Sequence, residues 1–521
     1  MSKQEIKKEE KPEEVIRAEQ LIDDGKLDEA LTLLNNCEQK EELTHLDKAS
    51  CHLLHCQILF WQGKDKELIK QTEQTYKESG GRENNLFTVD NLLIMTYALV
   101  RLDRFDEAFD LMKQGEELVK MIPQELTEAY KQREAYLALI KGIFYNRRNS
   151  PNDVDLALKH LEHSLALREE LGIKHEISET LTQMAFNLCV FKGELNRALK
   201  YADESLALAK ESSKTYYIAF SLNILGIIYE FKGELDQSTI HYEQSLELFK
   251  ELNDKKHIAT VFNNLSSIYK MKGELDRALE CIEQAMTLNR ELGGITALAK
   301  NHDYLIQILI EKGDLERAQI SLHDLEQLKT QLEGKTVYLL SLYNKALLLK
   351  ESPRISNRSK AEEILKQILE DEDIFWEIKE RALLTLCELL LIEFQMTNEV
   401  EVLDELESLI TRLLENAEKS HSYWLMGETY LLQAKLALLS LDLNKAKESL
   451  ERAQQITEEY GLNQLTERIS IEQDKLFSYT NKWLSSKNST ATIVELSNLA
   501  PLKEQIQYML KKREILKKFN I

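Results

Sequence analysis

Apolar residues recur along this chain with the spacing of one helix face. One set, at positions i, i+3, i+4 and i+7 before Gly233, consists of Leu222, Leu225, Gly226 and Tyr229. The same places before Gly273 are occupied by Phe262, Leu265, Ser266 and Tyr269. A second apolar face follows each glycine and includes Leu206, Leu246 and Leu288. This alternation predicts pairs of amphipathic helices joined by short turns.

The turn between the two helices is a repeated motif. Related heptads of the form Gly-Glu-Leu-Asp-Arg-Ala-Leu begin at Gly193, Gly233, Gly273 and Gly313, each 40 residues after the one before. Glycine ends a helix well because it adopts the left-handed conformation without steric cost. Small residues five places on allow close helix approach: Ala198, Ser238, Ala278 and Ala318. Weaker copies extend the array both ways, so we expect about eleven helix pairs.

The pattern divides the chain into four segments. Residues 1–11 are alternately charged and are expected to be disordered. The repeat array is expected over 12–480 and is most regular over 179–330, with a linker at 481–492. Residues 493–521 form a basic amphipathic pattern. This last helix either caps the final repeat or binds a partner or an anionic surface, and the sequence leaves both interpretations open.

Composition narrows the class of partner. The chain has only 17 glycines and 5 prolines in 521 residues, which favours helix. The net charge of −22 disfavours nucleic acid and anionic membranes as partners, because both attract positive surface. There is no long apolar run that could cross a membrane and no apparent secretory leader. With six cysteines lacking a paired spacing, we expect a cytoplasmic protein.

Candidate chemistry is sparse. On a helix, His52, His55 and Cys56 share a face that could hold zinc. Their place in the repeat is the packing face, so a hydrogen-bonded core histidine is the preferred interpretation and no metal is expected. No phosphate-binding glycine loop is present, and the acidic residues follow surface spacing. We therefore predict no cofactor and no enzymatic activity.

The turn and the residues before it resemble the tetratricopeptide repeat (TPR) family. Gly226, Tyr229, Gly233 and Ser238 match the family pattern in one unit, and Ser266, Tyr269, Gly273 and Ala278 match it in the next. The period of 40 residues is longer than the usual repeat of about 34, and is similar to repeats of kinesin light chains, polarity adaptors and bacterial regulators. The resemblance implies an all-α, right-handed superhelical solenoid of antiparallel helix pairs.

The resemblance also implies a binding groove on the concave face, lined by the first helix of each pair. The positions that would point into it are Gln183, Asn187, Phe220, Asn223, Ile227, Thr260, Asn263, Asn264, Ser267, Lys300, Asp303 and Gln307. Amides are frequent in this set, and an amide can both donate to and accept from a peptide backbone. The family's clamp for a C-terminal carboxylate is only partly matched, by Asn264 and Lys300.

These features predict a non-enzymatic scaffold or adaptor that binds a protein or an extended peptide in the concave groove. The alternative is a sensory or regulatory module that binds a small peptide or ligand and changes conformation. An RNA-binding helical repeat conflicts with the acidic charge. Nothing in the sequence indicates the oligomeric state or the identity of the partner.

Overall fold

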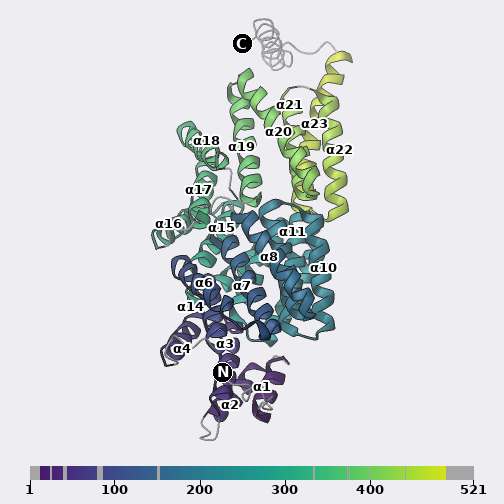
Figure 1. Ribbon diagram of the computed structural model, residues 1–521. Coiled ribbons are helices and arrows are strands. Elements are labelled where there is room, and N and C mark those ends of the chain that lie inside the picture. Colours follow the sequence, from purple (N-terminus) through teal and green to yellow (C-terminus); the bar gives the residue numbers. More distant parts are fainter. Residues whose placement is uncertain are drawn as a thin grey trace.

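The structure is a computed structural model of an all-helical chain (Figure 1). It describes residues 12–488 except for 24–25, 39–43, 79–85, 149–152, 332–334, 372–373, 375, 398 and 441. Within these residues there are 23 α-helices and no strand. They form eleven antiparallel pairs followed by one further helix, so the predicted architecture of about eleven pairs is confirmed.

The first helix of each pair carries an odd number. These helices are α1 (Glu13–Asp23), α3 (His45–Trp61), α5 (Leu86–Arg101), α7 (Thr127–Arg148), α9 (Lys174–Asn187), α11 (Thr215–Lys232), α13 (Lys255–Met271), α15 (Ile295–Glu311), α17 (Lys335–Lys350), α19 (Trp376–Thr397) and α21 (Tyr423–Leu439). The final helix is α23 (Asn463–Asn488). A π-helical turn, η2 (Leu188–Lys192), extends α9, and a short 3-10 turn, η1 (Gln124–Leu126), precedes α7.

The second helix of each pair carries an even number. These helices are α2 (Leu27–Glu38), α4 (Asp65–Glu78), α6 (Phe105–Lys120), α8 (Asp153–Leu171), α10 (Leu195–Glu211), α12 (Leu235–Glu251), α14 (Leu275–Leu292), α16 (Leu315–Gln331), α18 (Ile355–Leu369), α20 (Val400–Ser420) and α22 (Leu443–Tyr460).

The contact within each pair depends on the small residue after the turn. Ala198, Ser238, Ala278 and Ala318 are fully buried, as the repeat pattern predicts. The Ser238 hydroxyl donates to the Gly226 carbonyl of the facing helix at 2.8 Å, which leaves no room for a larger side chain between α11 and α12. The glycines of the turn have positive φ, for example 87° at Gly233, so the predicted left-handed helix end is also confirmed.

The odd-numbered helices form the inner layer of the solenoid. Each packs on its own partner and also on the next odd-numbered helix, as α5 does on α7 and α15 on α17. Each pair has an apolar face that it cannot bury alone, and this stacking covers it. The buried apolar residues consequently form one core that runs through almost the whole described array, from Val15 on α1 to Ile469 on α23.

The array coils tightly enough for successive superhelical turns to touch. Lys256 on α13 bonds Asp65 on α4 at 3.1 Å, and Ser422 before α21 donates to the Phe231 carbonyl on α11 at 2.7 Å. Both contacts join residues 191 apart in the sequence and link each helix pair to the fifth pair after it. Figure 1 accordingly shows the first pairs at the bottom and the last pairs at the top of one continuous coil.

The chain ends of the predicted segmentation are only partly within the described residues. Helix α23 continues to Asn488, so residues 481–488 of the predicted linker are helical. The predicted charged tail at 1–11 and the predicted basic helix at 493–521 lie outside the described residues. No described helix is long and apolar enough to cross a membrane.

The contact between superhelical turns can be tested at two turn glycines. Gly193 and Gly313 both have positive φ, 65° and 77°. A Cβ on Gly193 would lie 2.7 Å from the ring of Trp376 on α19, whereas a Cβ on Gly313 would meet nothing within 4 Å. We expect Gly313→Ala to lower the free energy of unfolding by about 1 kcal/mol through backbone strain alone. Gly193→Ala should lower it by about 1–3 kcal/mol more, because the contact is overpacked.

The measurement is urea unfolding of both variants beside the wild-type protein. Equal losses of stability for the two variants would mean that α9 and α19 are not in contact in solution.

Candidate functional site

The predicted groove residues all lie on the inner helices α9, α11, α13 and α15. Their exposure differs widely. The exposed members are Thr260 and Lys300; the half-buried ones are Phe220, Ile227, Asn264 and Gln307; the buried ones are Gln183, Asn187, Asn223, Asn263, Ser267 and Asp303. Half of the predicted set is therefore packed inside the fold.

The amides of the inner helices bond one another across consecutive repeats. Side-chain bonds join Asn187 to Asn146 at 2.6 Å, Asn264 to Asn223 at 3.2 Å, Asn301 to Asn263 at 2.7 Å and Asn344 to Asp303 at 2.7 Å. In each case the bond joins one odd-numbered helix to the next. Because buried polar groups need partners, these amides hold the stacking register of the repeats.

The expected exposure of Asn263 is wrong. The residue is 7% exposed, and its side-chain oxygen accepts from Asn301, which itself accepts from Asn289. Within its own helix Asn263 has only apolar neighbours at the packing positions, which is why it was expected to face a ligand. Its partner lies 38 residues away on the next repeat, and a pattern read within one helix does not reveal that partner.

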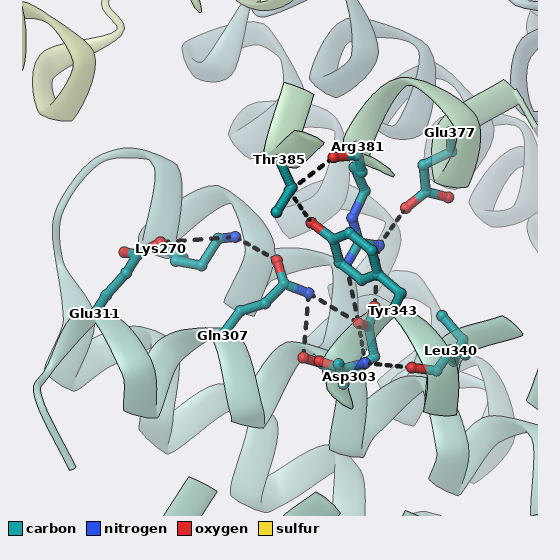
Figure 2. Close-up of polar contacts among 10 residues, drawn as sticks. Lys270, Asp303, Gln307, Glu311, Leu340, Tyr343, Glu377, Arg381 and Thr385 are labelled. Atoms are coloured by element: carbon teal, nitrogen blue, oxygen red, sulfur yellow. Dashed lines mark hydrogen bonds and ion pairs between the residues drawn. The ribbon is translucent and has the colours of Figure 1, made fainter. Parts of the chain in front are cut away.

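Asp303 and Gln307 belong to a polar network that joins four inner helices, α13, α15, α17 and α19 (Figure 2). The Arg381 guanidinium on α19 donates to both carboxylate oxygens of Asp303 on α15, at 2.9 and 3.0 Å, although 78 residues separate them. The same guanidinium lies 4.5 Å from the ring of Tyr343 on α17. Gln307 donates to Asp303 at 3.0 Å and accepts from Lys270 at 2.8 Å. Asp303 thus acts as an internal anchor, with its charge satisfied by the protein.

Lys300 is one of the two exposed residues of the predicted groove. Its side chain reaches solvent, yet it is surrounded by protein on the inside of the coil. That burial lowers the pKa of the Lys300 amine, while Glu377 on α19 opposes the effect. The charge of Lys300 therefore belongs to the inner surface of the superhelix.

A cavity that the sequence analysis missed lies where the first odd-numbered helices converge. It has a volume of about 240 Å³ and is lined by residues of α3, α5, α7, α9 and α11. Its aromatic lining consists of Phe60, Trp61, Tyr97, Tyr136, Tyr216 and Tyr217. Trp61 stacks on Tyr216 with ring centroids 5.3 Å apart, which brings α3 against α11. We call this space the tyrosine cavity.

The phenol hydroxyls of the tyrosine cavity form no hydrogen bond with the described residues. They belong to Tyr97, Tyr136, Tyr216 and Tyr217. Burial raises the pKa of Tyr136, Tyr216 and Tyr217 well above the ordinary value, and nearby Glu179 acts in the same direction. These hydroxyls therefore stay protonated, and each can both donate and accept a hydrogen bond.

Two carboxylates beside the tyrosine cavity are already paired. Asp90 accepts from Arg133 at 2.5 Å, and Glu179 accepts from Arg168 at 3.1 Å. Burial raises the pKa of both carboxyl groups, and the paired arginines oppose that rise. The cavity thus presents aromatic faces and neutral hydroxyls, with its charges compensated at the edge.

Adjacent aromatic residues in the sequence were the available signal for this cavity. Phe60-Trp61 ends α3 and Tyr216-Tyr217 lies near the start of α11. Only the pitch of the superhelix brings these two ends together, so the signal could not be interpreted from one repeat.

Two members of the His/Cys group on α3 pack as expected: Cys56 is buried, and His52 is half-buried and hydrogen-bonded. His55 is half-buried. His52 bonds Asn91 at 3.1 Å and Thr75 at 3.3 Å, and Cys56 lies 3.3 Å from the same imidazole. Among the described residues, no group of three or more His, Cys, Asp or Glu side chains is arranged to hold a metal ion.

A family model described as the MalT-like TPR region matches residues 179–462, just over half of the chain. No curated protein matches the sequence.

Several solved structures are similar to this chain at low identity. The apo form of the quorum sensor NprR from B. thuringiensis is 12% identical, with a TM-score of 0.45 over 70% of this chain and 99% of that one. A Rap protein complexed with Competence and Sporulation Factor is 16% identical, with a TM-score of 0.43 over 67% of this chain and 98% of that one. Yeast Tom70 is 14% identical, with a TM-score of 0.37 over 84% and 98%.

We expect the Asp303 carboxylate to stabilise the folded protein. Removing this carboxylate with Asp303→Ala would leave the buried Arg381 guanidinium with Glu377, at 3.2 Å, as its remaining carboxylate partner among the described residues. Breaking a buried ion pair typically costs about 3–5 kcal/mol, and we expect a loss near the lower end of that range because Glu377 remains. The matched control is Asp276→Ala, since Asp276 is 90% exposed and pairs with Lys312 at the surface. That change should cost less than about 1 kcal/mol. Urea unfolding of both variants decides the matter, and a small loss for Asp303→Ala would contradict a structural role.

The second prediction concerns Glu230 on α11, which accepts from the Tyr242 hydroxyl at 2.7 Å. Burial raises the pKa of Glu230 from 4.5 to about 7. Between these values the folded protein holds a proton that the unfolded chain releases, so the free energy of unfolding falls as pH rises through this range. Glu230→Gln keeps a neutral acceptor at this position. We therefore expect it to be more stable than wild type at about pH 8, and this advantage should shrink toward about pH 5.

Thermal melting at several pH values between these limits measures the effect, with Glu247→Gln on the exposed face of α12 as the control. A constant difference between Glu230→Gln and wild type across the range would show that Glu230 is already ionised in the folded protein.

Proposed function

We propose that this chain, which belongs to the family of MalT-like TPR regions, binds a peptide or a segment of a partner protein on the inner surface of its solenoid. The observation that carries the proposal is the tyrosine cavity, about 240 Å³ in volume, where five consecutive odd-numbered helices converge. A concave apolar site with a few unsatisfied polar groups is the typical form of a binding site.

Tyrosine suits this role physically. Its ring provides a large contact area with little conformational entropy to lose, and its hydroxyl can bond a peptide N–H or carbonyl group. Four such rings, from Tyr97, Tyr136, Tyr216 and Tyr217, line one small space, and their hydroxyls have no hydrogen-bond partner among the described residues. A peptide side chain that enters this space would pack against aromatic faces and bond the hydroxyls at the same time.

The residues of the concave surface divide into two groups, those that bond neighbouring repeats and those that remain available to a ligand. Asn223, Asn263 and Asp303 bond neighbouring repeats and supply rigidity. The half-buried and exposed positions between them, such as Phe220, Thr260 and Lys300, remain available to a ligand that extends along the inside of the coil. A rigid framework lowers the entropy lost on binding.

The proposal assigns binding and no reaction to the chain. Asp90 and Glu179, the carboxylates that line the tyrosine cavity, are held in ion pairs by Arg133 and Arg168. The net charge of −22 also disfavours nucleic acid as the partner. We place the protein in the cytoplasm on the sequence evidence alone.

A second candidate function is a regulatory module that changes curvature when a ligand binds. The contacts between superhelical turns favour it, because polar contacts such as Thr296 with Asp103 and Gln464 with Glu311 can be exchanged for bonds to water. A ligand held between turns would bind one curvature better than another and shift the population toward it.

The test uses a random displayed peptide library selected against the intact chain. Peptides that bind should lose affinity about tenfold or more, roughly 1.4 kcal/mol, when Tyr136→Phe and Tyr217→Phe together remove two cavity hydroxyls. The matched control is Tyr338→Phe, since Tyr338 is an exposed tyrosine of α17 outside the cavity. Equal affinity for wild type and the double variant would exclude the tyrosine cavity as the binding site.

Small-angle scattering with the same peptides separates the two candidate functions. An unchanged radius of gyration on binding indicates a rigid scaffold, and a changed one indicates a regulatory switch in curvature.

A further inference from the structure

A second and larger cavity lies toward the C-terminal end of the described array. Its volume is about 530 Å³, and its lining comes from α17, α18, α19, α21 and α23. The helices that form the tyrosine cavity, α3 to α11, contribute nothing to it. The two cavities are therefore separate sites on one solenoid, and the C-terminal cavity is not part of the function proposed above.

Four cations line the C-terminal cavity, and only two of them have carboxylate partners. Lys350 pairs with Glu388 at 2.7 Å, and Lys475 pairs with Glu472 at 2.8 Å. The other two, Arg358 on α18 and Lys435 on α21, form no ion pair with any residue that the structure describes. Two uncompensated cations thus share one cavity.

Arg358 has donors that the protein does not satisfy. Its Nε is buried without a hydrogen-bond partner among the described residues. One terminal nitrogen lies 3.8 Å from the sulfur of Met396, which is a weak acceptor. A buried donor left unpaired costs free energy that a ligand acceptor would recover. The planar fork of a guanidinium matches the paired oxygens of a carboxylate or a phosphate.

The surroundings of Lys435 disfavour the protonated form of its amine. Burial and the nearby Arg468 lower the pKa of its amine, although Glu472, Glu388 and Glu428 act in the other direction. Those three carboxylates are already bonded to Lys475, Lys350 and Arg468. An additional anion beside Lys435 would complete the local balance of charge.

The rest of the lining consists of four aliphatic residues and two polar ones, Gln395 and Glu351, and Glu351 lies 3.8 Å from Lys350. Leu391 and Ile392 of α19 and Leu438 and Leu439 of α21 face the same cavity. A volume of about 530 Å³ falls in the range of pockets that hold small organic molecules, and it is far more than an inorganic ion fills. The site therefore offers an apolar surface beside its two unpaired cations.

We propose that this cavity binds a small organic oxyanion, a carboxylate or a phosphate ester, that carries a short aliphatic chain. Arg358 and Lys435 bind the charged head, and the four aliphatic side chains of α19 and α21 contact the chain. Burial of the aliphatic part should raise affinity by about fourfold per methylene group.

The test is calorimetric titration of the purified full chain with hexanoate, hexyl phosphate and the neutral hexanamide. We expect binding of at least one oxyanion that is tighter than binding of hexanamide by about tenfold or more. Tighter binding of hexanoate identifies a carboxylate site, and tighter binding of hexyl phosphate identifies a phosphate-ester site. Failure of both oxyanions to bind, or equal binding of hexanamide, overturns the proposal.

Substitutions locate the site. Arg358→Gln and Lys435→Gln should each weaken oxyanion binding about tenfold or more. Both should melt at or above the wild-type temperature, because each removes a cation without a partner. Lys447→Gln is the matched control, since Lys447 is 68% exposed on α22, and it should bind as wild type does. Wild-type affinity in both cavity variants overturns the proposal.

A measurement on the wild-type protein makes the result independent of the variants. A bound oxyanion should slow acylation of the Lys435 amine by an amine-reactive reagent, and mass spectrometry of the digested protein reads this residue separately from Lys447. Equal acylation rates of Lys435 with and without a saturating oxyanion overturn the proposal.

Discussion

The carboxylate of Asp65 bonds two cations that come from different parts of the superhelix. Arg101, on the next helix pair, lies 3.3 Å away, and Lys256, on the following superhelical turn, lies 3.1 Å away. Burial would raise the pKa of Asp65, but the two cations together hold it below its ordinary value. This charged contact and the neutral hydrogen bond from Ser422 to the Phe231 carbonyl both join helix pairs that are five apart, and together they constrain the pitch of the coil. The shape of the inner surface follows from that pitch.

A close pitch gives the concave face two different kinds of surface. Where consecutive inner helices run side by side, amides and the Asp303–Arg381 pair bond across repeats, and little polar capacity remains for a ligand. Where helices from opposite sides of one superhelical turn meet, side chains from non-neighbouring repeats face one another. The tyrosine cavity forms at such a place, because Trp61 and Tyr216 close the turn between α3 and α11.

The two cavities differ in the interactions they leave unsatisfied. The tyrosine cavity has neutral hydroxyls and compensated charge, which suits a peptide side chain with polar edges. The C-terminal cavity has two cations without carboxylate partners beside an aliphatic wall, which suits an anionic head with an apolar body. Because each is lined by helices of several repeats, a ligand in either cavity contacts several repeats and can stabilise their relative positions.

The sequence by itself determined the local structure of this protein. The heptad at Gly273, the small residue at Ala278 and the apolar spacing before each turn were sufficient for the helix pairs, their number and the solenoid class, since each depends on residues within about 40 positions. The predicted groove residues all lie on inner helices, but the sequence did not give their exposure. Asn263 and Asp303 are buried because their partners, Asn301 and Arg381, lie one and two repeats away. Only the tertiary structure decided the pitch and hence both cavities. Small rotations between successive helix pairs add up over five repeats to the pitch of the coil. Contacts between residues 191 apart constrain this total rotation. The sequence of a single repeat does not encode it.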